Sequence, residues 1–93
     1  MKAAEWIDRV KVAKGWESDY RVGKELGFSR AVVSNYRTKA RATLDDDNAT
    51  KVAAAIGIPA EAVLVDQYVE RSKSDSALAA LRRLREMFSV YYV

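Results

Sequence analysis

Two glycines four residues apart, Gly23 and Gly27, constrain the fold of this 93-residue chain more than any other feature. Gly27 follows a short helical pattern and can end a helix, because glycine adopts positive φ at little cost. Ser29 comes two residues later, and serine is a typical N-cap for a following helix. The sequence therefore predicts one short helix that ends at Gly27 and a second that begins after Ser29, joined by a turn of about three or four residues.

The faces of this helix pair meet the other requirements of a helix-turn-helix. Two helices that cross closely need a small residue at the crossing, and Gly23 lies there. Val33 and Tyr36 are three residues apart and are expected to anchor the second helix by its inner side. The outer side then presents Arg30, Ala31, Ser34, Asn35 and Arg37.

Apolar residues recur three or four positions apart through most of the remaining chain, which predicts an all-α fold. A first helix is expected to end at Gly15, and a fourth to end at Gly57. The fourth begins with the acidic run 45–47, which we interpret as helix-start acids because it lacks the spaced ligands of a calcium loop. A fifth helix covers about Ala60–Arg71, and a sixth begins at about Ser76.

Aromatic residues on these apolar stripes are expected to be core residues and not platforms on which bases stack. They are Trp6, Trp16, Tyr36 and Tyr68. In the fifth helix, Val63 and Leu64 are expected to point inward together with Tyr68. The basic residues are not interleaved with these aromatics, which argues against binding of single strands or RNA.

Positive charge is concentrated in the middle of the chain. The formal net charge is +3, and it divides into 0 for residues 1–20, +5 for residues 21–41 and −2 for residues 42–93. The basic residues of the middle third are Arg21, Lys24, Arg30, Arg37, Lys39 and Arg41. They form either an ordinary solvated face or, with the helix pair, a surface for an anionic partner.

Several classes of protein are excluded by composition. The chain has no cysteine and no histidine, which removes disulfide frameworks, zinc fingers and the commonest nucleophiles and bases. No paired carboxylates and no phosphate-cradling loop are recognisable, so we expect no enzyme, no cofactor and no small-molecule ligand. The segment Met1–Trp6 lacks a signal-peptide core, and no run approaches about 18 apolar residues. We therefore expect a cytoplasmic protein without a membrane partner.

The segment 19–38, DYRVGKELGFSRAVVSNYRT, resembles the helix-turn-helix of the Cro and lambda-repressor class of DNA-binding domains. Residues 44–58 resemble the fourth helix of that family, and the likeness covers about residues 1–70. It is nearest to small regulators encoded by bacteriophages and prophages. The resemblance implies a five-helix bundle, with residues 1–73 as the DNA-binding domain and residues 74–93 as a C-terminal helix or tail.

In this family the third helix enters the major groove, and its first residues meet base edges. The resemblance implies base contacts by Arg30, Ala31, Ser34, Asn35 and Thr38. It implies phosphate contacts by Tyr20, Lys24, Ser29, Arg37, Lys39 and Arg41. Where family members often have a phosphate-binding glutamine at the start of the second helix, this chain has Asp19, which is expected only to cap that helix.

The C-terminal segment has two interpretations. Its apolar residues form a homodimer interface, or the last helix packs back on the domain and covers Trp6 or Trp16. The expected dimer residues are Leu78, Leu81, Leu84, Phe88 and Tyr91. Residues 90–93 have a strand-like composition, so an exchanged terminal strand is a further variant of the dimer.

The function that these observations favour is sequence-specific binding of double-stranded DNA by a transcription regulator in a bacterial cell. A phage or prophage repressor or Cro-like protein, acting as a dimer, fits the short length. The alternative is an antitoxin-like or host-takeover module that binds another protein through its apolar C-terminus.

Overall fold

The computed structural model describes all residues, Met1–Val93, and consists of helices with no strand. The helices are α1 (Ala3–Lys14), α2 (Asp19–Leu26), α3 (Arg30–Thr38), α4 (Asp46–Ile56), α5 (Ala60–Arg71), α6 (Asp75–Glu86) and a final 3₁₀ turn, η1 (Ser89–Tyr92). The expected all-α class is confirmed. None of these helices is long and apolar enough to cross a membrane.

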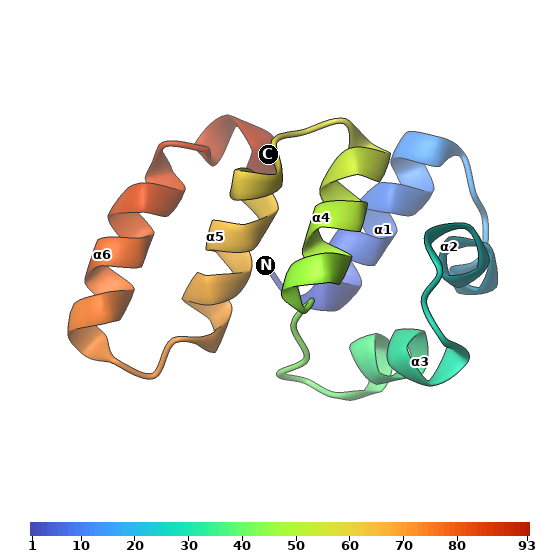
Figure 1. Ribbon diagram of the computed structural model, residues 1–93, viewed down its shortest axis with the longest axis horizontal. Coiled ribbons are helices and arrows are strands. Elements are labelled where there is room, and N and C mark those ends of the chain that lie inside the picture. The colour runs from blue at the N-terminus through green and yellow to red at the C-terminus, as the bar shows by residue number, and fades with distance from the viewer.

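The helices form an elongated body of 38 × 25 × 19 Å (Figure 1). α4 packs against both α1 and α5, and α6 packs against the other side of α5. α2 and α3 contact each other and α1, and α3 lies crosswise beneath the ends of its neighbours. The α2–α3 pair and α6 therefore lie at opposite ends of the long axis.

Side-chain caps explain where the central helices begin. The Ser18 hydroxyl accepts a hydrogen bond from the Arg21 amide at 3.1 Å, so Ser18 caps α2 and the expectation that Asp19 is the cap is wrong. Asp45 accepts from the Asn48 amide at 2.7 Å, which confirms that this acid starts α4. α2 ends at Gly27, whose φ of 77° is the left-handed conformation that the sequence predicts there.

The core lies between α1, α4 and the inner sides of α2, α3 and α5. Its fully buried large apolar side chains are Trp6, Ile7, Val10, Val22, Leu44, Val52 and Val63. Tyr36 is buried as predicted, and Trp16 is partly buried against the core. The aromatic core is thus confirmed except at Tyr68.

The expectation that Tyr68 points inward is wrong. Its side chain is 42% exposed, and its hydroxyl donates to Asp46 at 3.2 Å. Its ring lies under the guanidinium of Arg71, 4.8 Å from the ring centroid. Besides three apolar residues, α5 buries two polar ones, Asp66 and Gln67, neither of which has any exposed surface.

Asp66 can be buried because each of its carboxylate oxygens has two donors. One oxygen accepts from the α-ammonium of Met1 at 2.9 Å and from Arg85 Nε at 2.8 Å. The other accepts from Trp6 Nε1 at 2.8 Å and from Gln67 Nε2 at 3.0 Å. Burial raises the pKa of Asp66, but the hydrogen bonds to its charged form outweigh burial and hold the pKa below its ordinary value.

The C-terminal turn packs on α1 and α5, so the tail covers Trp6. The rings of Tyr92 and Trp6 meet edge-on with centroids 6.2 Å apart, and the Tyr92 hydroxyl donates to the Ala62 carbonyl at 2.6 Å. The Arg9 guanidinium donates to the carbonyl of Tyr91 at 2.6 Å and also to that of Tyr92. Packing back onto the domain was one of the two interpretations of this segment.

Residues 90–93, whose composition is strand-like, form no strand in this chain. The Tyr91 amide donates to the Phe88 carbonyl at 2.9 Å, which closes a 3₁₀ turn. Arg9 and the Trp6 ring contact this turn, and an exchanged terminal strand would have to break those contacts.

Gly23 is expected to be intolerant of a branched side chain. A Cβ atom at Gly23 would lie 3.0 Å from the carbonyl oxygen of Phe28 and 3.3 Å from Val33 Cγ2. We expect Gly23→Val to lower the free energy of unfolding by roughly 1–3 kcal/mol, because the α2–α3 crossing has no room for it. Urea denaturation measures this change in the free energy of unfolding. Lys24→Val controls for valine in a helix at an exposed position, and an equal loss in both variants would contradict the packing argument.

Candidate nucleic-acid interface

The helix pair is held together by its turn and by two anchors on α3. The Phe28 amide donates to the Gly23 carbonyl at 2.8 Å, and Val33 packs at the crossing. Tyr36 meets Phe28 edge-on at 6.4 Å, and its hydroxyl accepts from Asn48 Nδ2 at 2.9 Å. These contacts fix α3 by its inner side against α2 and α4.

The outer side of α3 carries all the predicted base-contacting residues, and all of them are exposed. They are Arg30, Ala31, Ser34, Asn35 and Thr38. The side chains of Arg30 and Asn35 make no hydrogen bond or ion pair within the chain, so their donors and acceptors are free. The Thr38 hydroxyl donates to the Ser34 carbonyl at 3.0 Å, so its hydrogen is already used.

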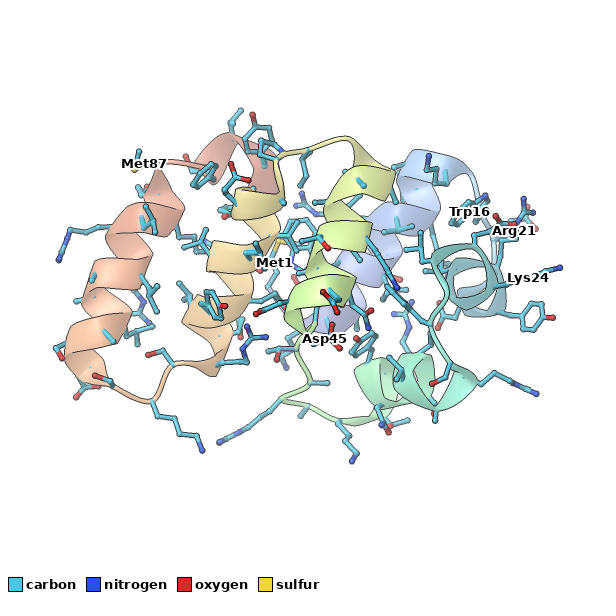
Figure 2. All side chains as sticks on the ribbon, viewed as in Figure 1. Met1, Trp16, Arg21, Lys24, Asp45 and Met87 are labelled. Carbon is cyan, nitrogen blue, oxygen red and sulfur yellow. The ribbon has the colours of Figure 1, made fainter.

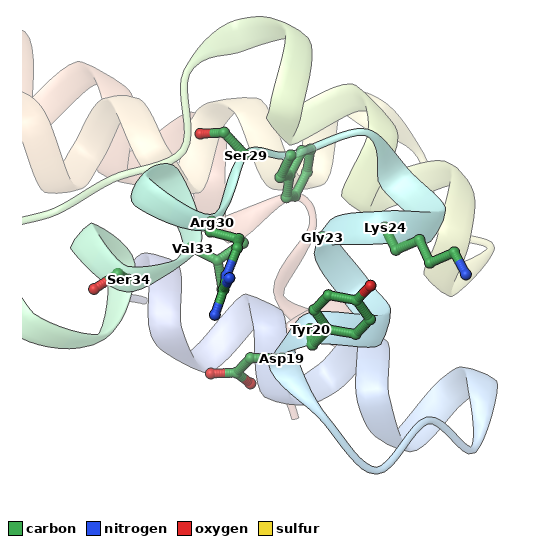
Figure 3. Close-up of a pocket in the computed structure, with 9 residues that line it drawn as sticks. Asp19, Tyr20, Gly23, Lys24, Ser29, Arg30, Val33 and Ser34 are labelled. Carbon is green, nitrogen blue, oxygen red and sulfur yellow. The ribbon is translucent and has the colours of Figure 1, made fainter.

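A groove of about 540 Å³ runs between α2 and α3 on this outer side (Figure 3). Asp19, Tyr20 and Lys24 line it from α2, and Arg30 and Ser34 line it from α3. Lys24 extends away from the body in both side-chain views (Figures 2 and 3). The groove therefore brings together predicted base contacts from one helix and predicted phosphate contacts from the other.

The predicted phosphate contacts divide into two groups. Lys24, Lys39 and Arg41 are exposed and form no ion pair, and Tyr20 is exposed beside Lys24. Ser29 is exposed at the start of α3, where its hydroxyl oxygen accepts from the Val32 amide at 3.1 Å. Arg37 is different because carboxylates already bind it.

Arg37 is paired with two acids of neighbouring helices. Its Nε and Nη2 donate to the two oxygens of Asp19 at 2.7 and 2.8 Å, and Nη2 also donates to Asp8 at 2.6 Å. Lys11 contacts Asp19 at 3.2 Å. The hydrogen bond from Arg37 lowers the pKa of Asp19 to about 2, and the bonds to both acids raise the pKa of Arg37. A phosphate contact by Arg37, as the sequence predicts, would compete with these pairs.

Lys51 is a basic residue of this region that the sequence reasoning missed. It belongs to α4, and its ammonium lies 5.8 Å from the centroid of the Phe28 ring, beside Gly27. It therefore adds a positive charge next to the turn that precedes α3. Lys51 belongs to the net-acidic segment 42–93, and only the packing of α4 brings it next to the turn.

Comparison with family models, with curated proteins and with solved structures found no match to this chain. The geometry and chemistry of the α2–α3 surface are therefore the basis on which a function can be proposed.

Proposed function

We propose that this protein binds double-stranded DNA sequence-specifically and regulates transcription. The observation that carries the proposal is the outer face of α3, where free polar side chains line a short exposed helix anchored by its opposite side. Such a helix fits the major groove, which is wide enough to admit one α-helix.

The side chains of this face have the chemistry of base recognition. Arg30 can donate twice to O6 and N7 of guanine, and Asn35 can pair with N6 and N7 of adenine. Ala31 offers a methyl group for contact with a thymine methyl. Ser34 and Thr38 lie on the same face and can bind either bases or sugars.

Unpaired cations border the same face. Lys24 lies on α2, Lys39 and Arg41 follow α3, and Lys51 lies beside the turn. Cations of this kind neutralise phosphates and release counterions, which gives affinity and register but no sequence information. The combination of free base-reading groups with bordering cations supports DNA as the partner.

We propose further that α6 forms a homodimer. No residue of α6 is buried, and exposed apolar side chains continue from Leu84 (46%) in α6 to Met87 (75%) and Val90 (72%) after it. Of the predicted dimer residues, Leu78, Leu81, Phe88 and Tyr91 are half-buried. A two-fold dimer would present two α3 helices to half-sites about 34 Å apart. A phage-type repressor or Cro-like protein that occupies a promoter would act in this way.

The experiment that tests both proposals is selection of bound sequences from random duplexes, combined with a mass determination in solution. We expect an enriched palindromic site and the mass of a dimer. Failure to enrich any duplex would contradict DNA recognition. A monomeric protein that enriches a single half-site would contradict the dimer alone, and the exposed apolar residues of α6 would then favour binding of another protein.

A further inference from the structure

Four charged side chains from three helices meet at one edge of the α3 face. Asp8 and Lys11 belong to α1, Asp19 to α2 and Arg37 to α3. We name this group the Arg37 cluster. Arg37 is seven residues after Arg30, two helical turns later, so it lies on the same edge of α3 as that predicted base contact.

The Arg37 cluster is electrically balanced and occupies Nε and Nη2 of Arg37. Two carboxylates face two cations, and Arg37 makes three hydrogen bonds of 2.6 to 2.8 Å to Asp8 and Asp19. The paired, nearly parallel bonds to Asp19 are the strong geometry for a guanidinium and a carboxylate. Arg37 is nevertheless 31% exposed, so it is not a core ion pair and lies within reach of an approaching polyanion.

We infer that the Arg37 cluster is a specificity-determining element, in which Asp8 and Asp19 withhold Arg37 from DNA phosphates and so suppress sequence-independent binding. This inference rests on the proposed function. Sequence-independent affinity comes almost entirely from cations on phosphates, and specificity is the ratio of affinities for the site and for random DNA. At the selected site the base contacts of Arg30 and Asn35 fix the register of α3, whereas in sequence-independent binding every free cation can reach a phosphate. Withholding Arg37 therefore lowers affinity for random DNA more than affinity for the site, which raises that ratio.

The cluster also explains the acid at the first position of α2. Asp19 lines the groove between α2 and α3, where its charge repels phosphate, yet α2 is capped by Ser18 and does not need it. Binding of Arg37 is the role that the contacts of Asp19 assign to it. The same bonds connect the C-terminal end of α3 to α1 and α2. They therefore also limit rotation of α3 within the major groove of DNA.

The test compares three variants with the wild type on the selected duplex and on a random duplex, over about 50–300 mM salt. Asp8→Asn combined with Asp19→Asn should free Arg37. We expect affinity for the random duplex to rise roughly three- to tenfold, and the slope of log affinity against log salt to steepen by about 0.9. Affinity for the selected duplex should rise less, so the ratio of the two falls. Adding Arg37→Met to this pair should abolish the gain.

The charge control is Glu5→Gln combined with Glu17→Gln, which removes two exposed carboxylates that form no ion pair. An equal gain in this control would overturn the inference, because the effect would then be one of net charge. A second pair of variants compares Arg37→Met with Lys39→Met. Only Lys39→Met should make the random-duplex slope shallower by about 0.9, and an equal change in Arg37→Met would show that Arg37 already contacts phosphate.

Urea denaturation of each variant ensures that all comparisons use folded protein. If the wild type binds no duplex, the proposed function fails and this inference fails with it. If the wild type enriches a site but the Asp8 and Asp19 variant gains no random-duplex affinity, the inference alone fails.

Discussion

Asp66→Ala is expected to lower the free energy of unfolding by about 3–5 kcal/mol, the usual cost of removing one partner from a buried ion pair. Domains of this kind have roughly 5–15 kcal/mol in total, so the expected loss is a large fraction of the stability of the fold. The reason is that Asp66 is fully buried and receives hydrogen bonds from four donors. Its loss leaves Arg85 Nε and Trp6 Nε1 without an acceptor, and it leaves the Met1 ammonium with Glu70 alone.

Glu70→Ala is the matched control. Glu70 also accepts from the Met1 ammonium, at 2.8 Å, but its side chain is 37% exposed. Its removal should cost no more than about 1 kcal/mol. Urea denaturation followed by tryptophan fluorescence and circular dichroism measures the free energy of unfolding of both variants. A loss at Asp66 as small as that at Glu70 would show that the buried network contributes little.

The same carboxylate predicts part of the acid sensitivity of the fold. The pKa of Asp66 is lowered in the folded state, so its contribution is fully present above its unfolded-state pKa of about 3.9 and is lost as the pH falls below that value. Asp66→Asn cannot be protonated in this way. We therefore expect this variant to lose less stability than the wild type between about pH 5 and pH 2. Equal losses in the two proteins would show that the Asp66 carboxylate does not contribute to the acid sensitivity.

Arg30→Ala is expected to weaken binding of the selected duplex by about 1–3 kcal/mol, roughly 5- to 150-fold, while affinity for random duplex largely survives. The side chain is exposed and makes no hydrogen bond or ion pair within the chain, so its removal should leave the fold intact. Asn35→Ala should have an effect of similar size, but at a different base pair of the site.

Competition binding with single-base variants of the site measures this prediction. Arg30→Ala should relax discrimination at one position, and Lys39→Ala should weaken binding of all duplexes alike. If Arg30→Ala weakens every duplex equally, its role is phosphate binding and the assignment of base contact is wrong.

Much of the fold was predictable from local rules. Glycine stops and serine or aspartate caps act within one helical turn, so the ends of α2 at Gly27 and the start of α4 after Asp45 follow from nearby residues. The apolar spacing likewise indicated Val33 and Tyr36 as anchors of α3. These features depend on residues close in sequence, which a pattern can display.

The errors occurred where partners are distant in sequence. Asp66 looks like a surface residue of α5, but donors far away in the sequence make its burial possible, namely Met1, Trp6 and Arg85. Tyr68 takes the exposed side of the same helix as a consequence. Arg37 has the charge of a phosphate contact, but its partners Asp8 and Asp19 lie 29 and 18 residues away. No periodicity in the sequence could reveal those pairs.

The exposed face of α3 has a consequence for how its binding can be controlled. Its hydrogen-bonding groups are a guanidinium, an amide and two hydroxyls, on Arg30, Asn35, Ser34 and Thr38. None of these groups is a thiol or a thioether, and the chain has no cysteine. The pattern that this helix presents is therefore the same in oxidised and in reduced surroundings, and under the proposed function occupancy of DNA would respond to the amount of protein and not to the redox state of the reading surface.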